Sequence, residues 1–339
     1  MPRIEEIMST QELINYTKTR QPIPMMGDVL FPERKIEGLE IEMVKGASNL
    51  PVAASVHAFD TETEIASREG ASKAIEELAL IKRKIKVSEK ELIALNAPRN
   101  AQEEEQVIKK LFNDVDNLVA SVKTRVEAMR MEALSTGKIV LNENGVKGTI
   151  DFGTPSGHKD TKTWKSGTPD ILGDIYTMTD KIVADTGFTP TRALTSRTVL
   201  NAILKDEKIR TAMFGVNAAK VATLVELNQL LASQDLPVIA TYDAQYRIQN
   251  NKGIYTPKRY LADNMFILMP DGMMGETLYG LTAEEVELRN KSDIDITNIG
   301  NIIVEQYATT DPVAKWIKAV ATALPSFPYA DQVFMATIN

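Results

Sequence analysis

The sequence has no cysteine and only two histidines, His57 and His158, among its 339 residues. The absence of cysteine excludes disulfides, thiolate metal sites and cysteine nucleophiles, and it fits a reducing compartment. No apolar run approaches the roughly 18 residues that a membrane-spanning helix needs, and residues 1–20 lack the apolar core of a signal peptide. We therefore expect a protein that is made and kept in the cytoplasm, with no membrane partner.

The charge balance also excludes a class of proteins. The formal net charge is −7, which argues against a protein whose main task is to grip nucleic acid. Hydrophobic residues make up 43% and charged residues 25% of the chain, as in ordinary soluble globular proteins. The length predicts two domains rather than one.

Residues 100–136 carry the strongest secondary-structure signal. Their apolar residues recur every three or four positions, which predicts one long amphipathic helix. Asn100 and Glu103 stand where a capping box begins a helix, and Gly137 stands where a helix ends. The helix would be about 54 Å long. An apolar stripe of that length needs an elongated molecule or neighbouring subunits to cover it.

The first 87 residues lack a core of their own. Ser9 and Glu12 predict a short capped helix ending near Thr19, as part of an N-terminal arm. Residues 39–44 and 52–56 have the composition of extended segments, and apolar and basic side chains alternate over residues 81–87. With so few large apolar side chains, residues 36–87 are predicted to form a long β-loop that projects from the body.

The remaining segments alternate between helical and extended patterns. Ser88 and Glu91 predict a capped helix, and Asn142–Gly145 predicts a hairpin turn. The Gly-rich stretch 153–167 is predicted to be mobile. Helices are expected at residues 170–186, 196–205 and 218–232, and strands at 237–242, 245–249, 265–269 and 333–338. A last helix is expected to begin at Asp311-Pro312 and to carry Trp316, Ile317, Val320 and Leu324.

No group of residues has the composition of an active site. Gly153–Lys159 lacks the glycine-lysine-hydroxyl ending of a phosphate loop, and the two histidines are expected to be solvated rather than catalytic. Asp293 and Asp295 alternate and could bind a divalent cation, but no further ligand is spaced nearby, so a solvated strand edge is favoured. We expect no enzyme activity, no cofactor and no bound metal.

Residues 82–86, Lys-Arg-Lys-Ile-Lys, form the one dense basic run. This run could contact the phosphates of nucleic acid, or it could contact acidic patches on sister subunits. Its place on the projecting loop of an acidic chain favours sister subunits. A solvated face is nearly as well supported.

The stretch Arg259–Pro270, followed by Gly275–Gly280, resembles the corresponding segment of the lambda-like major capsid protein E family of tailed phages. The resemblance continues in order along nearly the whole chain. The other matching segments are Leu30–Pro32, Leu50–Val52, Ile81–Lys84, Ile150–Gly153, Leu236–Ile239, Tyr242-Asp243 and Leu324–Ser326.

The resemblance implies an α+β chain with the tailed-phage major capsid fold. Its parts would be an N-terminal arm (1–35), an extended β-loop (36–87), a peripheral domain (88–188 plus 304–339) with the spine helix 100–136, and an axial domain (189–303). In that fold the arm and the loop reach over neighbours. There is no long N-terminal prosegment of the kind that some relatives use as a built-in scaffold, so a separate scaffolding protein is implied.

The implied function is that of a major capsid protein, which self-assembles into hexamers and pentamers of an icosahedral shell enclosing double-stranded DNA. Implied partners are further copies of the chain, a scaffolding protein, a portal, decoration proteins, and packaged DNA bound without sequence-specific contacts. The implied location is the virion capsid, after assembly in the host cytoplasm. The residues expected at inter-subunit contacts are Phe31, Met43, Val52, Phe59, Lys82, Arg83, Lys84 and Lys86.

Three alternatives stay open at this point. An encapsulin-like nanocompartment resembles the same fold and would load protein cargo instead of DNA. A cytoplasmic hydrolase could use a metal held by Asp293 and Asp295. A nucleic-acid-binding adaptor could use residues 82–86, and steep salt dependence of DNA binding would favour it.

Overall fold

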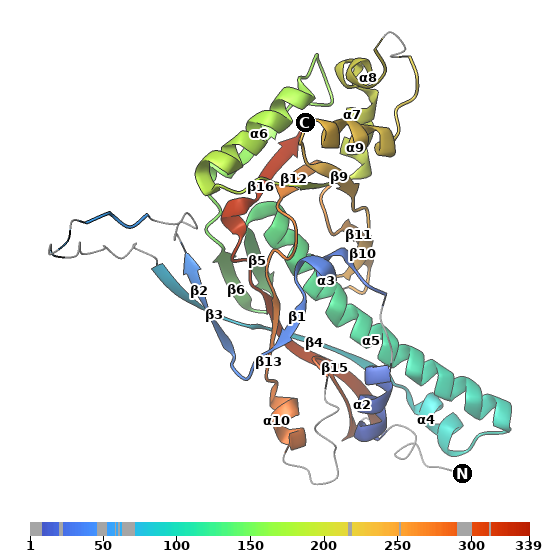
Figure 1. The fold of residues 1–339 in the computed structure, drawn as a ribbon. Coiled ribbons are helices and arrows are strands. Elements are labelled where there is room, and N and C mark those ends of the chain that lie inside the picture. The colour runs from blue at the N-terminus through green and yellow to red at the C-terminus, as the bar shows by residue number, and fades with distance from the viewer. Residues whose placement is uncertain are drawn as a thin grey trace. The chain divides into compact units, whose positions relative to one another are not determined.

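Figure 1 shows the fold of the chain in a computed structural model. The described residues group into two compact units. Unit 1 comprises Met1–Ile41, Glu77–Arg130 and Glu276–Ser326, and unit 2 comprises Glu42–Glu76, Met131–Gly275 and Phe327–Asn339. The structure describes residues 9–19, 23–45, 53–57, 59, 62, 72–215, 219–250, 252–289, 300–311 and 313–339. The division into arm, β-loop, peripheral and axial domains stays a prediction.

The helices of unit 1 are α2 (Thr10–Thr19), α3 (Met26–Leu30), α4 (Glu89–Asn96), α5 (Ala101–Thr136, through Arg130) and α10 (Ala283–Arg289). Three of them, α2, α4 and α5, begin where the sequence places caps. The Ser88–Glu91 capping box is present, and the Glu103 amide donates to Asn100 Oδ1 at 2.8 Å. At the other end of α5, Gly137 has a φ of +71°. Residues with a side chain rarely adopt this backbone conformation, so a glycine is favoured at this position. The long capped helix is therefore confirmed.

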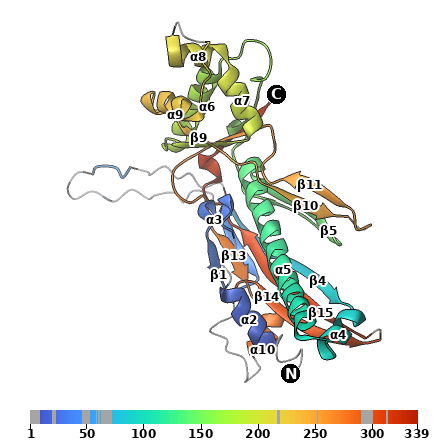
Figure 2. The same ribbon diagram turned by 90° about the vertical axis from the view of Figure 1, so that its right-hand side faces the viewer.

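A five-stranded sheet forms the rest of unit 1. Its order is β1 (Glu33–Lys35), β13 (Thr277–Gly280), β15 (Val313–Pro325) and β14 (Ile303–Thr310), and β4 (Ala79–Val87) pairs with the other edge of β15. Figure 2 shows α5 running alongside the long strands of this sheet. Leu111, Val115, Leu118 and Val122 of α5 are at most 2% exposed, so the apolar stripe of the helix is covered in this part.

The prediction of a helix that begins at Asp311-Pro312 and carries Trp316 to Leu324 is wrong, because these residues lie in the strand β15. β15 pairs antiparallel with β13, β14 and β4, and it is buried almost continuously from Ala319 onward. A strand buried on both faces has no alternating pattern, so its apolar residues can also match helical spacing by chance. Asp311 lies in the turn between β14 and β15 instead of capping a helix.

The basic part of the predicted β-loop belongs to this sheet. β2 (Glu40–Lys45) and β3 (Ser72–Glu77) form a separate two-stranded ribbon. β2 agrees with the prediction that residues 39–44 are extended. Directly after it, β4 pairs over nine positions with β15, from Ala79 opposite Ala323 to Val87 opposite Lys315. Residues 53–57 are described but form no strand.

Unit 2 is built around a second five-stranded sheet. Its order is β7 (Lys159–Lys162), β16 (Phe334–Ile338), β12 (Met265–Met269), β8 (Arg192–Thr195) and β9 (Val238–Thr241). The helices α6 (Ile171–Thr186), α7 (Arg197–Lys205), α8 (Glu207–Phe214) and α9 (Leu224–Ser233) contribute to one hydrophobic core with this sheet. The central strand β12 is buried at every residue, as its apolar run predicted.

Two hairpins, β5 (Lys138–Glu143) with β6 (Val146–Asp151) and β10 (Gln245–Gln249) with β11 (Tyr255–Arg259), complete unit 2. The β5–β6 turn is Asn144-Gly145, both at positive φ, which confirms the predicted hairpin. Residues 153–167, which were predicted to be mobile, include regular structure. They contain a 3₁₀ turn (Ser156–His158) and β7, which pairs in parallel with β16. α8 was not predicted, and α9 begins six residues later than the predicted start at residue 218.

Candidate assembly surfaces

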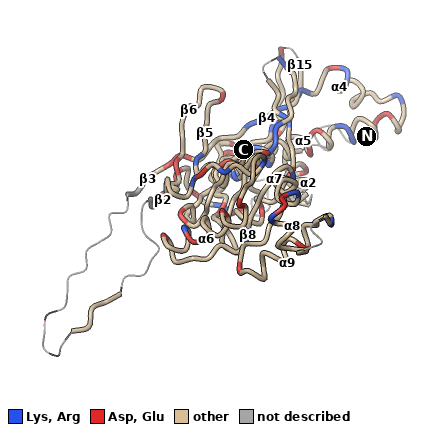
Figure 3. The backbone as a smooth tube through the Cα atoms, turned by 90° about the horizontal axis from the view of Figure 1, so that it is seen from above, with Lys and Arg blue, Asp and Glu red and all other residues tan. Residues whose placement is uncertain are grey.

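A row of lysines lies on one face of the unit 1 sheet. Lys82, Lys84 and Lys86 alternate along β4, so their side chains share a face, and all three are exposed. They belong to the basic stretch drawn blue beside β4 in Figure 3. Among the described strands, only β15 pairs with β4, and it does so along one edge. Within the described residues, no strand pairs with the other edge of this nine-residue strand, and we call it the open edge of β4.

Aromatic rings from the neighbouring strands stand beside these lysines. Trp316 lies opposite Lys86 in β15, and Tyr307 lies opposite Trp316 in β14, with the two rings stacked at 6.4 Å. Lys84 Nζ lies 4.5 Å from the centre of the Trp316 ring and donates to the Tyr307 hydroxyl at 3.1 Å. The rings stabilise the ammonium group of Lys84 by cation–π contact. No described carboxylate forms an ion pair with it.

Two carboxylates neutralise the other part of the face. Lys318 Nζ lies 2.8 Å from Glu284 and 2.7 Å from Glu305, and Lys82 lies 3.7 Å from Glu284. Burial works to lower the pKa of Lys318, but its hydrogen bonds to the two carboxylates outweigh burial and raise it. Burial likewise works to raise the pKa of Glu284, and the hydrogen bond from Lys318 contributes most to lowering it. A depression of about 480 Å³ lies here.

An apolar groove lies between α4 and the tip of the β14–β15 hairpin. Its volume is about 610 Å³, and its lining includes Leu92, Ile93, Ala308, Val313 and Ala314. Ile93 is 66% and Val313 60% exposed, and no residue of α4 is buried. An isolated eight-residue helix is marginally stable in water. Because no residue of α4 is buried, packing against its own chain adds little to the stability of this helix.

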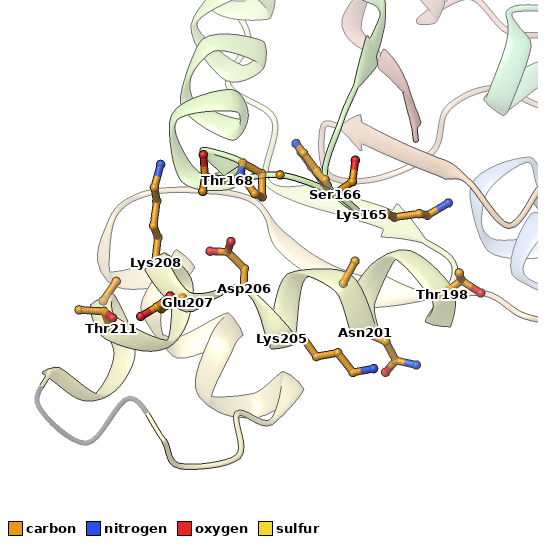
Figure 4. A pocket seen from close by; sticks show the side chains of 15 residues that line it. Lys165, Ser166, Thr168, Thr198, Asn201, Lys205, Asp206, Glu207, Lys208 and Thr211 are labelled. Carbon is orange, nitrogen blue, oxygen red and sulfur yellow. The ribbon is translucent and has the colours of Figure 1, made fainter.

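A cleft within unit 2 has a volume of about 1110 Å³ (Figure 4). Lys165, Ser166 and Thr168 face it from the loop before α6, and side chains of α7 and α8 face it from the other side. Charges of both signs line it, among them Lys165, Asp206 and Lys208. Lys208 also lies 4.0 Å from Asp170, at the start of α6. Within the described residues no three metal-ligating side chains gather, and Asp293 and Asp295 lie outside the described residues.

A buried ionic network holds the segment before β1 against α5. Arg130, only 2% exposed, lies 2.5 Å from Asp28 and 3.4 Å from Glu127, and its Nε donates to Thr277 Oγ1 at 2.8 Å. Glu33 completes the group, 3.8 Å from Arg130 Nη2. Sequence reasoning missed this network. Its only local signal is the spacing of Glu127 and Arg130, three residues apart within the apolar stripe.

The two histidines differ in burial. His57 is exposed, as predicted, but the prediction of a solvated His158 is wrong because its side chain is completely buried. His158 Nε2 lies 3.1 Å from Asp185 Oδ2, and the ring stacks on Phe334. Lys181, followed by His158, lowers the pKa of Asp185 through hydrogen bonds. The histidine thus joins the 3₁₀ turn to α6 within unit 2 and has a structural role.

Comparison with known families decides what kind of protein carries these surfaces. The family model described as phage major capsid protein E matches residues 9–338. The chain belongs to the phage major capsid protein E family. Members of this family are structural subunits of phage capsids, and the match favours this function over an encapsulin-like compartment. Among curated proteins, no sequence matches the chain.

Solved structures support the capsid fold of this family member. A prophage capsid protein from Escherichia coli CFT073 is 15% identical, has a TM-score of 0.59, and is matched over 97% of this chain and 99% of its own. A phage-related protein from Bordetella bronchiseptica RB50 is 13% identical, with a TM-score of 0.50 and coverage of 96% and 95%. The predicted α+β tailed-phage capsid fold is thereby confirmed. In the described part of the chain, no helix has the length and apolarity to cross a membrane.

The contact residues expected for a capsid protein of this family divide into three groups. Lys82, Arg83, Lys84 and Lys86 all lie on β4, and Phe59 is fully exposed. Phe31 is 0% exposed, and its carbonyl accepts a hydrogen bond from Thr277. Val52 and the side chain of Met43 lie outside the described residues.

Proposed function

We propose that this capsid protein assembles into hexamers and pentamers of an icosahedral shell that encloses double-stranded DNA. The observation that carries the proposal is the apolar groove between α4 and the β14–β15 hairpin, whose walls include the exposed Ile93 and Val313. Covering exposed apolar surface contributes about 25 cal/mol per Å², so this groove is a surface that further copies would cover.

Many modest contacts would hold such a shell. Beside the groove, the proposed inter-subunit contacts are Met43, Val52, Phe59, Lys82, Arg83, Lys84 and Lys86. Exposed ion pairs each contribute only about 0–1 kcal/mol, but every subunit in a closed shell repeats the same set. The stability of the particle would therefore come from repetition of one interface rather than from one strong contact.

The other proposed partners act on the assembled shell. A separate scaffolding protein would guide assembly in the host cytoplasm, a portal would occupy one vertex, and decoration proteins would bind outside. DNA would be packaged without sequence-specific contacts. The net charge of −7 supports this, because an acidic wall does not retain DNA tightly.

Negative-stain electron microscopy of the purified protein, alone and co-expressed with its neighbouring reading frames, tests the proposal. Closed particles or rings of five and six subunits are the expected result. A protein that sediments as a monomer at every concentration and with every co-expressed protein would contradict it.

A further inference from the structure

The open edge of β4 is a place where another extended segment can add through backbone hydrogen bonds. Lysines along such an edge normally prevent pairing, because a neighbouring strand brings its side chains close to uncompensated charge. Lys82, Lys84 and Lys86 therefore disfavour a neutral or basic strand. They favour a strand that carries carboxylates at alternate positions, so the same row that blocks general association selects an acidic partner.

Residues 60–64 of the chain have the required pattern. They read Asp-Thr-Glu-Thr-Glu, so three carboxylates alternate with threonines, which favour strands. In an extended segment, alternate side chains stand about 7 Å apart on one face, which is also the spacing of the three lysines. We propose that residues 60–64 of a second copy add as a strand to the open edge of β4. This inference rests on the proposed self-assembly and names one of its contacts.

Charge on the sheet face favours a protein partner over nucleic acid. Glu284 and Glu305 lie within 3.7 Å of Lys82 or Lys318, where they would repel phosphates laid across the face. Lys84 and Lys86, by contrast, have no described ion-pair partner, and they lie on the edge strand itself. An added acidic strand would place carboxylates beside these two lysines without approaching Glu305.

Another acidic pair in the sequence offers a poorer match. Asp293 and Asp295 also alternate, but they supply two carboxylates for three lysines. The middle residues of the two triplets are Glu62 and Lys84. They face each other whether the strands run parallel or antiparallel, so this pair tests the contact without assuming a direction.

The absence of cysteine makes cross-linking specific. The variant Glu62→Cys with Lys84→Cys is assembled, then treated with an oxidant or a short bismaleimide, and separated on a denaturing gel. We expect a ladder of covalent multimers. The pair Asp295→Cys with Lys84→Cys should give none. Cross-links only within single chains, no cross-link in well-formed particles, or a ladder from the Asp295 pair alone would each overturn the proposal.

Charge reversal gives an independent test. The face variant carries Lys82→Glu, Lys84→Glu and Lys86→Glu, and the segment variant carries Asp60→Lys, Glu62→Lys and Glu64→Lys. Each alone is expected to lower particle yield about tenfold or more, because attraction becomes repulsion at every contact. Mixed together they should form rings of six, in which the two variants alternate and every contact again joins opposite charges. Two variants cannot alternate around a ring with an odd number of subunits. Rings of five should therefore not form from the mixture.

The control carries the same change in charge at three other exposed lysines, Lys147→Glu, Lys252→Glu and Lys258→Glu. It keeps the row on β4, so it should assemble by itself and should not rescue the segment variant. Mixtures that stay unassembled while each variant is folded by circular dichroism would overturn the proposal. So would a face variant that forms normal shells and loses only DNA, since the row would then bind nucleic acid. Wild-type protein that forms no particles would instead count against the proposed function.

Discussion

The backbone amide of Gly27 donates a hydrogen bond to Glu127 Oε1 at 3.0 Å, across one hundred residues of sequence. This bond joins α3 to α5 at a point where both partners are buried. A Cβ added to Gly27 would lie 2.2 Å from Glu127 Oε2 and 2.6 Å from Arg130 Cδ. The approach of the two helices therefore requires a residue without a side chain at this position.

Gly27→Ala is expected to lower the free energy of unfolding by about 1–3 kcal/mol, because the buried neighbours must move to admit a methyl group. Urea unfolding followed by circular dichroism measures the change. Gly148→Ala is the control, since a Cβ there meets nothing within 4 Å. Equal stability of the two variants would contradict the packing described at Gly27.

Arg130→Met is expected to cost about 3–5 kcal/mol, because it leaves the buried Glu127 carboxylate without its cation. The double variant Arg130→Met with Glu127→Leu should lose less, since the uncompensated charge goes as well. Thermal unfolding of both variants separates charge burial from loss of packing. A double variant no more stable than the single one would show that packing of the guanidinium dominates.

The buried hydroxyl of Tyr279 is expected to make the stability of the folded protein fall at alkaline pH. Burial, together with the neighbouring Glu33, raises the pKa of its hydroxyl far above the ordinary value near 10. The folded state therefore keeps this proton after the unfolded state has lost it. The contribution of the Tyr279 hydroxyl to the free energy of unfolding is complete below pH 10. Above pH 10 this contribution falls by about 1.4 kcal/mol per pH unit. The difference between wild type and Tyr279→Phe, measured by urea unfolding from pH 8 to 11, should shrink by that slope.

Ile93→Asp tests whether the groove beside α4 is covered in particles. Since Ile93 is 66% exposed, the free energy of unfolding should change by no more than about 0.5 kcal/mol. Particle yield in sedimentation should nevertheless fall sharply, because a charge would be buried at each contact. Val221→Asp, at a residue that is 82% exposed and does not line the groove, should assemble normally. Normal assembly of both would remove the groove from the interface.

The segment between β2 and β3 can be shortened without removing β4 from its sheet. Replacing residues 46–71 by a short Gly-Ser linker is expected to leave a folded protein with an unchanged circular dichroism spectrum. It should no longer form closed particles, because Val52, Phe59 and residues 60–64 are lost. Electron microscopy provides the measurement, and normal shells from the shortened chain would refute the role proposed for this segment.

Local patterns were enough to predict several elements. The caps of α5, the Asn144-Gly145 turn and the apolar run of β12 depend on residues only a few positions apart. Such signals act before any distant segment is in place, so composition and spacing reveal them. The alternation of Lys82, Lys84 and Lys86 likewise predicted an extended segment.

Distant contacts decided the rest. Val313–Pro325 became a strand because β4, β13 and β14 pair with it, although its apolar residues also match helical spacing. That pairing also decided which edge of β4 stays open. Arg130 and His158 are buried because Asp28 and Asp185 come to them from positions far along the chain. A polar side chain can be buried only when such partners are present, and its own neighbours in sequence do not reveal them.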